Sequence, residues 1–579
     1  MFVPNYQALS LFRVLFSLYL LFDYYIDVYP YSEAFFTDSG ILPLSVLSSQ
    51  ENRAGLSFML PMLWLLDALG IQTLFPVLYT AALTAFGLGY KTRWANAMAF
   101  ALNGYLYWRN PYLRSGAEQL SNLLLLWSWF LPLNRYWSID SALTTEARDP
   151  TDPQLPFVAM SIQISSVYVF AALFKLAGLP WRDGSAISWA LGDNVFGSTP
   201  VSLFLLREYP VLLNIITYIT IVFQLAFPLL LYSPWRNDLT RAFALICAAM
   251  MHVSFIFCLN IGGFPYISLI ALVLLVPDTW INRFLRSRRA RLGRITIFYD
   301  PNCGFCHRIS LLLREFLLTR TSLVLPASAD PHVLRLLTEN NSWVVRDENG
   351  QLHLKWSAMA YLLKQHMILA PLGHISDFHV FGGFFNWAYD FVGRNRHRLG
   401  PSARILLPFG CPYPTGGPAT TLCGLLAVLA LASNISSVYL RNFNQPTVFD
   451  HFTAALQVRQ RWALFAPVPT NAQWQFRIMA RVDEQTLMDL MDLPKAPLYR
   501  SGDGQRIEFA SARWRRYFTF FAVFSEADWA ALGNYFCLQA RLMPGLDRVQ
   551  EIEITVDKSS ILDTAGANVQ HIQRAFNCK

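Results

Sequence analysis

The sequence predicts a polytopic α-helical membrane bundle that carries an inserted α/β domain and a C-terminal mixed α/β or mostly β domain. Three observations support this fold class. Hydrophobic residues make up 54% of the 579 residues and charged residues only 15%, which is more apolar than a soluble protein of this length. Apolar runs long enough to cross a bilayer recur through the first half of the chain. A strand–turn–helix pattern near residue 300 then interrupts these runs.

Eight segments in the first half of the chain could each supply the roughly 20 apolar residues that span a bilayer. They fall near residues 9–27, 70–90, 94–108, 118–133, 157–177, 211–232, 242–260 and 261–277. Three charged residues within them, Arg13, Asp23 and Glu118, are costly in lipid, so we expect them to face the bundle interior or the interface. The predicted bundle occupies residues 1–282, and a further apolar run predicts another transmembrane helix at 418–441.

Basic residues gather beside the apolar segments, on what alternation of the spans makes one face of the membrane. They are Lys91, Arg93, Arg236, Arg241, Arg283, Arg286, Arg288, Arg289, Arg291 and Arg294. The positive-inside rule makes this face cytoplasmic, as in a bacterial inner or plasma membrane, and leaves the loops around 28–56 and 178–210 outside. Arg109 and Arg114 are exceptions on the outer side. Because topology explains the formal charge of +8, the expected partner is a lipid bilayer and not nucleic acid.

The inserted domain begins with Ile295–Ser310, ITIFYDPNCGFCHRIS, which joins a strand, a turn and an amphipathic helix. Cys303 and Cys306 form the one close pair among eight cysteines, and they lie where the strand gives way to the helix. Unpaired backbone N–H groups and the helix dipole favour a thiolate at Cys303. A thiolate with a second thiol one turn away is typical of a dithiol–disulfide redox pair.

Three other interpretations use the same two cysteines. CGFCH also matches the C-x-x-C-H pattern of covalent haem attachment, although the strand–turn–helix context does not require haem. A zinc site would need a second ligand pair at similar spacing, and none is visible nearby, so no metal is predicted. The plain alternative is two buried structural cysteines.

The residues YDPNCGFC resemble the D-x-x-C-x-x-C signature of the DCC family of thiol–disulfide oxidoreductases. A hairpin with an Asn-Gly turn, WVVRDENGQLHL (343–354), and a basic segment, YDFVGRNRHR (389–398), follow in the order of that family. The resemblance implies a thioredoxin-like domain over 290–402, with Cys303 as attacking thiolate and Cys306 as resolving thiol. It also implies a redox partner protein or a quinol-linked partner.

One lysine lies near the outer end of an apolar helix, in VYVFAALFKLAGLPWRDGSAISW (167–189). Lys175 is followed by a Gly/Pro break and by a polar segment that contains tryptophan. Its amine either extends to the interface or is partly removed from water, which would make it usable as a base. Sequence alone favours the interfacial position.

The bundle carries a second resemblance. The stretch around Lys175, with YWSID (136–140) and with LNIGGF (259–264), resembles the transmembrane domain of vitamin K-dependent γ-carboxylases, also called the HTTM domain. The resemblance covers residues 5–280. The Asn-Gly-Gly-Asp turn of many bacterial members is represented here only by SGAE (115–118).

This second resemblance implies roles for two residues. Lys175 lies where the family carries its catalytic base, and His252 lies near a histidine of a comparable segment. The implied chemistry is deprotonation of a reduced quinone or another weak acid.

Residues 445–579 have the mixed composition of a soluble domain, which the predicted topology places outside the cytoplasm. Partly alternating patterns predict strands near 474–482 and 552–556. The segments QRWALFAP (460–467) and SARWRRY (511–517) resemble the C-terminal extension of bacterial HTTM proteins.

Two further sets of residues stand out in this C-terminal region. We expect Arg513, Arg515 and Arg516 to form a solvated basic face, with contact to lipid phosphates or to a substrate as the alternative. Cys537 and Cys578 could pair, but sequence cannot show that they are close.

Three functions remain open at this point. The first is a membrane-anchored thiol–disulfide oxidoreductase that uses Cys303 and Cys306. The second is a carboxylase-like, quinone-dependent membrane enzyme with Lys175 as base and His252 assisting. The third is a non-catalytic membrane maturation or scaffold factor for a secreted peptide client. No cofactor is assigned; a quinone fits the second function, and covalent haem is disfavoured.

Overall fold

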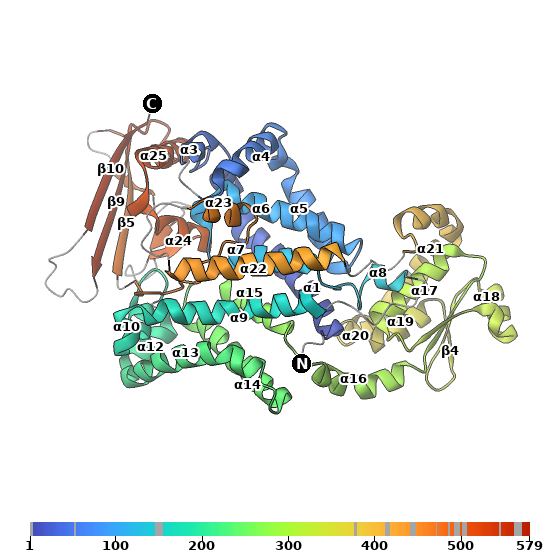
Figure 1. Ribbon diagram of the computed structural model, residues 1–579. Helices are drawn as coiled ribbons and strands as arrows, with labels where there is room; N and C mark the ends of the chain where they lie inside the picture. The colour runs from blue at the N-terminus through green and yellow to red at the C-terminus, as the bar shows by residue number, and fades with distance from the viewer. Residues whose placement is uncertain are drawn as a thin grey trace.

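The computed structural model is a long helical bundle with a small α/β domain at one end and a β-sheet domain at the other (Figure 1). It describes residues 4–50, 54–144, 154–197, 199–375, 379–410, 417–439, 447–470, 472–483, 487–490, 498–500, 507–543, 546–560 and 570–578. The apolar content that predicted a membrane bundle is therefore concentrated in the middle of the molecule.

Among the described residues, nine helices form the body of the bundle. They are α1 (Tyr6–Asp23), α5 (Ile71–Leu88), α6 (Thr92–Arg109), α7 (Gly116–Ser128), α9 (Gln154–Leu176), α13 (Pro210–Leu231), α14 (Asn237–Cys258), α15 (Phe264–Val273) and α22 (Pro418–Tyr439). Successive helices pair in opposite directions: Arg13 and Ser17 of α1 contact Gly87 and Leu83 of α5, and Asn96 and Asn103 of α6 contact Leu125 and Asn122 of α7. A helix is thus present at each of the eight segments that were predicted as spans.

Six helices of the described chain are long and apolar enough to cross a membrane. They are Tyr6–Phe36 taken as one run, α5, α9, α13, α14 and α22, with α15 and the start of α16 as a seventh, sharply bent candidate. The predicted spans 94–108 and 118–133 correspond to α6 and α7, which do not meet the same criteria. The reasons are that α6 carries several polar residues on a helix of 18, and α7 has only 13 residues.

Shorter helices close the ends of the bundle. They are α2 (Ser32–Phe36), α3 (Leu44–Ser48), α4 (Leu56–Ala68), α8 (Ile139–Ala142), α10 (Leu179–Asp183), α11 (Ala186–Gly192) and α12 (Pro200–Glu208), with a π-helical turn at Tyr24–Val28 and 3₁₀ turns at Tyr29–Tyr31 and Pro111–Leu113. Helix α8 belongs to the end that contacts the inserted domain. Arg109, one of the two exceptions to the positive-inside pattern, is buried and donates to Leu42 O and Asp38 at the opposite end.

The inserted domain follows α16 (Asp278–Leu292) and is built on a four-stranded sheet in the order β2-β1-β3-β4. Its elements are β1 (Thr296–Tyr299), α17 (Gly304–Leu317), β2 (Leu323–Pro326), a 3₁₀ turn at Ala327–Ala329, α18 (Pro331–Asn340), β3 (Val344–Arg346), β4 (Leu352–Leu354), α19 (Lys355–Gln365), α20 (Ala370–Ile375) and α21 (His379–Leu406). Strands β1 and β2 are parallel, whereas β3 is antiparallel to both β1 and β4. The strand and hairpin expected from the sequence are therefore observed.

The C-terminal domain is mixed α/β. It contains α23 (Val448–Ala455), β5 (Ala472–Arg481), β6 (Leu487–Asp489), β7 (Leu498–Arg500), β8 (Ile507–Phe509), α24 (Ala512–Phe518), a 3₁₀ turn at Phe521–Val523, α25 (Glu526–Arg541), β9 (Glu551–Ser560) and β10 (Gln570–Asn577). Its main sheet has the order β10-β9-β5-β6, all antiparallel. A disulfide between Cys537 of α25 and Cys578, just after β10, closes the domain.

Candidate functional site

The cysteine pair lies at the start of α17. Cys303 is the N-cap residue of that helix, and its sulfur accepts the backbone N–H of Cys306 at 3.2 Å. The two sulfurs form a disulfide, with the Cα atoms 5.3 Å apart. Cys303 is only 3% exposed, whereas Cys306 is half-buried, so Cys306 presents the more accessible sulfur of the pair.

Charged and aromatic side chains surround this pair. Asp300, in the turn before Cys303, is ion-paired at 2.9 Å with Arg396 of α21. His307, directly after Cys306, stacks on Tyr299 with ring centroids 4.4 Å apart. Burial, and after it the neighbouring charges of Arg308 and Arg314, lower the pKa of His307, so its imidazole is neutral at neutral pH.

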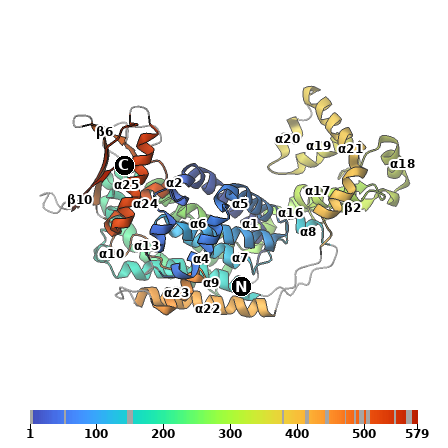
Figure 2. The same cartoon turned by 90° about the horizontal axis from the view of Figure 1, so that it is seen from above.

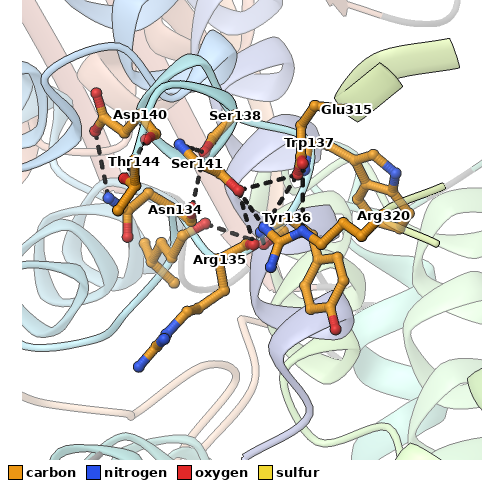
Figure 3. Close-up of polar contacts among 12 residues, drawn as sticks. Asn134, Arg135, Tyr136, Trp137, Ser138, Asp140, Ser141, Thr144, Glu315 and Arg320 are labelled. Atoms are coloured by element: carbon orange, nitrogen blue, oxygen red, sulfur yellow. Dashed lines mark hydrogen bonds and ion pairs between the residues drawn. The ribbon is translucent and has the colours of Figure 1, made fainter. Parts of the chain in front are cut away.

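The far end of the same helix contacts the bundle. Figure 3 shows Glu315 of α17 facing the loop before α8. The Glu315 side chain is 2% exposed, and its Oε1 accepts the Trp137 backbone N–H at 2.9 Å and the Ser141 hydroxyl at 3.1 Å. Arg320 pairs with Glu315 at 3.1 Å and lies over the Tyr136 ring. One helix therefore joins the cysteine pair to the bundle.

A cavity of about 1730 Å³ lies at the opposite end of the bundle, where the membrane helices meet the C-terminal domain. Its walls come from α9, α13 and α14, from the chain after α23, and from α24. Both Lys175 and His252 line it, so the structure brings these two predicted site residues to one chamber. Helix α17, at whose start Cys303 and Cys306 lie, belongs to the domain at the other end of the molecule (Figure 1).

Lys175 is 5% exposed and lies at the end of α9. Its ammonium nitrogen is 5.0 Å from the centre of the Trp181 ring, and Nζ has no hydrogen-bond or ion-pair partner among the described residues. Trp181 is fixed in turn, because its indole N–H donates to Phe465 O at 2.9 Å. The amine is therefore buried against an aromatic face.

His252 of α14 is 2% exposed. Its Nε2 is 2.9 Å from the Tyr168 hydroxyl, and Nδ1 has no partner in the described part of the chain. Tyr168 and Lys175 share α9 at a spacing of seven residues, which separates their Cα atoms by roughly 10 Å along the helix axis. His252 and Lys175 thus lie at different depths of the same cavity.

Sequence reasoning missed the role of residues 460–467 in this cavity. Gln460 exchanges two hydrogen bonds with Gln163 of α9, at 2.7 and 2.9 Å, although 297 residues separate them. Gly178 lies so close to Pro467 O that an added Cβ would be 1.6 Å from it. The contact requires glycine in the break after Lys175, so the segment QRWALFAP closes the cavity over that residue.

Arg513 and Arg515 of SARWRRY are buried and Arg516 is half-buried, which corrects the expectation of a solvated basic face. Arg513 is ion-paired with Asp23 at 2.7 Å and with Glu118 at 3.0 Å, and Asp27 lies 3.6 Å from its Nε. Burial acts to lower the pKa of Arg513, but the three carboxylates outweigh it and the pKa is raised. Arg513 of the C-terminal domain thus neutralises Asp23 and Glu118 of the bundle.

The other two arginines of this segment also bind backbone atoms of the bundle. Arg515 Nη1 donates to Asn260 O at 2.6 Å, and Arg516 Nε donates to Arg114 O at 3.0 Å. Helix α24 is therefore bound to the loops at this end of the bundle.

The bundle and the buried amine define a multi-pass membrane protein with an internal cavity. Residues 5–280 match the model of the HTTM domain family. No solved structure matches the chain.

Proposed function

We propose that the protein is a membrane-anchored thiol–disulfide oxidoreductase in which Cys303 and Cys306 are the redox pair, joined to a carboxylase-like membrane bundle. The observation that carries the proposal is the position of Cys303 at the N-cap of α17, where backbone N–H groups and the helix dipole stabilise a thiolate. The strand order β2-β1-β3-β4, with the cysteines directly after the first strand, supports a thioredoxin-like fold for the inserted domain.

A second observation supports the DCC resemblance. The aspartate of the D-x-x-C-x-x-C segment, Asp300, pairs with Arg396 of the basic segment at 389–398. The two sequence features on which the resemblance depends are therefore neighbours in space.

The reaction we propose is reversible thiol–disulfide exchange. With the pair reduced, the attacking thiolate forms a mixed disulfide with one sulfur of a partner's disulfide, and the partner's other sulfur leaves as a thiolate. The second cysteine then attacks the mixed disulfide, which releases the reduced partner and leaves Cys303–Cys306 oxidised. A redox partner protein or a quinol-linked carrier would restore the dithiol. Neutral His307 adds no positive charge beside the pair.

Trapping of the mixed disulfide in the full-length protein tests this proposal. Cys306→Ser should accumulate a mixed disulfide through Cys303 if the N-cap sulfur attacks. If the more exposed sulfur attacks instead, Cys303→Ser should trap the partner through Cys306. Cys423→Ser, which changes a buried free cysteine of α22, is the control. The proposal would be contradicted if neither variant traps a partner while both still reduce a disulfide substrate, with an added dithiol, as fast as the native protein does.

The two soluble domains lie on opposite sides of the membrane in this proposal. We infer that the inserted domain is cytoplasmic and the C-terminal domain extracytoplasmic. The basic residues at the inserted-domain end support this, as does the Cys537–Cys578 disulfide at the other end, because such bonds persist in oxidising compartments. In intact cells a membrane-impermeant maleimide should label Asp547→Cys and not Thr338→Cys. The reverse pattern would overturn the assignment.

The cavity favours a second candidate function, a carboxylase-like enzyme with Lys175 as general base and His252 assisting. The supporting observation is the buried Lys175 amine, which lines the cavity without an ion-pair partner among the described residues. A reduced quinone or another weak acid fits a largely apolar chamber that has one amine at its end.

The variant Lys175→Arg distinguishes two roles of Lys175, a general base and a structural cation. A guanidinium stays protonated at any workable pH, so arginine can replace the cation but not the base. The variant should insert and accumulate normally but lose the bundle's activity, and a quinone should be extractable from the purified native protein. Native behaviour of Lys175→Arg, together with a null Cys303→Ser, would leave the bundle as an anchor. Native behaviour of both variants would favour a maturation or scaffold factor for a secreted peptide.

A further inference from the structure

Helix α21 has two unlike faces. Its inner face packs on the inserted domain, because Phe385 stacks on Trp356 at 4.4 Å and the Tyr389 hydroxyl accepts the Trp343 N–H at 3.3 Å. Its outer face carries Phe384, Trp387 and Phe391, which are 61%, 63% and 58% exposed. These three rings form a continuous row, with neighbouring centroids about 6 Å apart.

Two arginines continue this row. Arg394 and Arg398 follow Phe391 at the i+3 and i+7 positions, so they lie on the same helical face, and both are exposed. We call Phe384, Trp387, Phe391, Arg394 and Arg398 the outer stripe of α21. Burial of the domain core does not account for an exposed row of aromatic residues that ends in arginines.

The helix before α21 also has exposed apolar residues. Ile368, Leu372 and Ile375 in and before α20 are 79%, 52% and 42% exposed. In Figure 2, α21 runs across the direction of α9 and α22, and α20 lies between it and the end of the bundle along that direction. A helix that crosses the bundle axis in this way is roughly parallel to the plane of the membrane.

The charge of the domain is suited to a lipid surface. Helix α21 carries four arginines against one aspartate, and α16, which leads from the bundle into the domain, carries five arginines against one aspartate. Both neighbours of the domain in the chain, α15–α16 and α22, belong to the bundle, so the domain is held at the membrane. Interfacial helices combine aromatic residues that enter the headgroup region with basic residues that bind lipid phosphates.

We propose that the outer stripe of α21 lies on the bilayer that the bundle spans, with its three aromatic side chains in the headgroup region and Arg394 and Arg398 on anionic lipid phosphates. This contact would hold the inserted domain, and with it the Cys303–Cys306 pair, against the membrane surface. The proposal does not depend on the activity of that pair.

Photo-crosslinking of the full-length protein tests the contact. A benzophenone amino acid replaces Trp387 in protein reconstituted into vesicles of phosphatidylcholine with phosphatidylglycerol, and mass spectrometry identifies the adducts. The expected product at position 387 is a phospholipid adduct. The matched control is the same substitution at Thr338, an exposed residue of α18 at the far side of the domain (Figure 1), which should give none.

Replacement of the two arginines tests the electrostatic part. Arg394→Gln and Arg398→Gln should each lower the ratio of bound to free stripe by about fivefold in anionic vesicles and have less effect in pure phosphatidylcholine. Arg335→Gln, an exposed change on α18, is the control. Equal lipid adducts at 387 and 338, or none at 387, would overturn the proposal. An adduct at 387 to another protein, or to a second copy of the chain, would replace the bilayer with that partner.

Discussion

The junction between the inserted domain and the bundle depends on one buried carboxylate, and Glu315→Ala should weaken it measurably. In the native protein the Glu315 carboxylate accepts bonds from Trp137 N–H and Ser141 and pairs with Arg320 (Figure 3). Trp137 has a left-handed backbone, with φ of 49°, which is unfavourable for a tryptophan. Arg13 donates to the Trp137 carbonyl, so hydrogen bonds hold both the N–H and the C=O of this residue.

The magnitude follows from burial. Removal of one partner of a buried ion pair costs about 3–5 kcal/mol. The Arg320 side chain is 36% exposed and can turn to water, so the lower figure of about 3 kcal/mol applies. A change of that size corresponds to roughly a hundredfold shift in the equilibrium between docked and undocked states. Glu315→Gln keeps an acceptor for the Trp137 N–H and loses only the charge, so roughly tenfold is expected.

Hydrogen–deuterium exchange of the peptide that contains Trp137 measures this shift directly. Exchange should be roughly a hundredfold faster in Glu315→Ala, intermediate in Glu315→Gln, and unchanged in Glu339→Gln, an exposed change on α18. If exchange at Trp137 and the thermal midpoint in Glu315→Ala both equal the native values, the carboxylate does not hold the junction.

Three other changes have defined outcomes. Arg513→Met should destabilise the protein by about 3–5 kcal/mol, because three carboxylates lose the cation between them; the measurement is the thermal midpoint in detergent, with exposed Arg548→Met as control. Cys537→Ser removes a bridge across 41 residues and should cost about 4 kcal/mol, and a reductant should lower the midpoint of the native protein more than that of the variant, which keeps only the Cys303–Cys306 disulfide. The pKa of His571 is raised from 6.5, chiefly by its hydrogen bond to Asp557, so its stabilising effect is complete below pH 6.5 and is lost as pH rises through the higher folded-state pKa. The protection of the β9 and β10 amides, which is the intrinsic exchange rate at each pH relative to their observed rate, should therefore fall across that range in the native protein and stay constant in His571→Gln.

Local patterns predicted the elements that depend on nearby residues. The strand–turn–helix around Cys303 and the N-cap position of that cysteine follow from β-branched residues, a turn and an amphipathic run within sixteen positions. The cost of charge in lipid predicted that Arg13, Asp23 and Glu118 face the bundle interior or the interface, and each has a hydrogen-bond or ion-pair partner inside the protein.

Long-range partners could not be predicted in the same way. Arg513 looked solvated because SARWRRY reads as a basic segment, and its carboxylate partner Asp23 lies 490 residues earlier in the chain. The segments 94–108 and 118–133 were predicted as spans from their apolar content alone. Tertiary packing instead accommodates the polar residues of α6 and the short length of α7.

The cavity extends the functional unit beyond the matched domain. The HTTM match ends at residue 280, yet the cavity that contains Lys175 and His252 is completed by residues 460–467 and by α24, which follow the inserted domain. Helix α22 makes this possible, because it starts at the inserted-domain end beside the start of α9 and runs parallel to α9 toward the C-terminal domain. The chain can therefore leave the bundle after α15, form the α/β domain and return without changing sides. A fragment that stops at residue 280 would lack one wall of the cavity and the cation that neutralises Asp23 and Glu118, so only the full-length chain can test either candidate function.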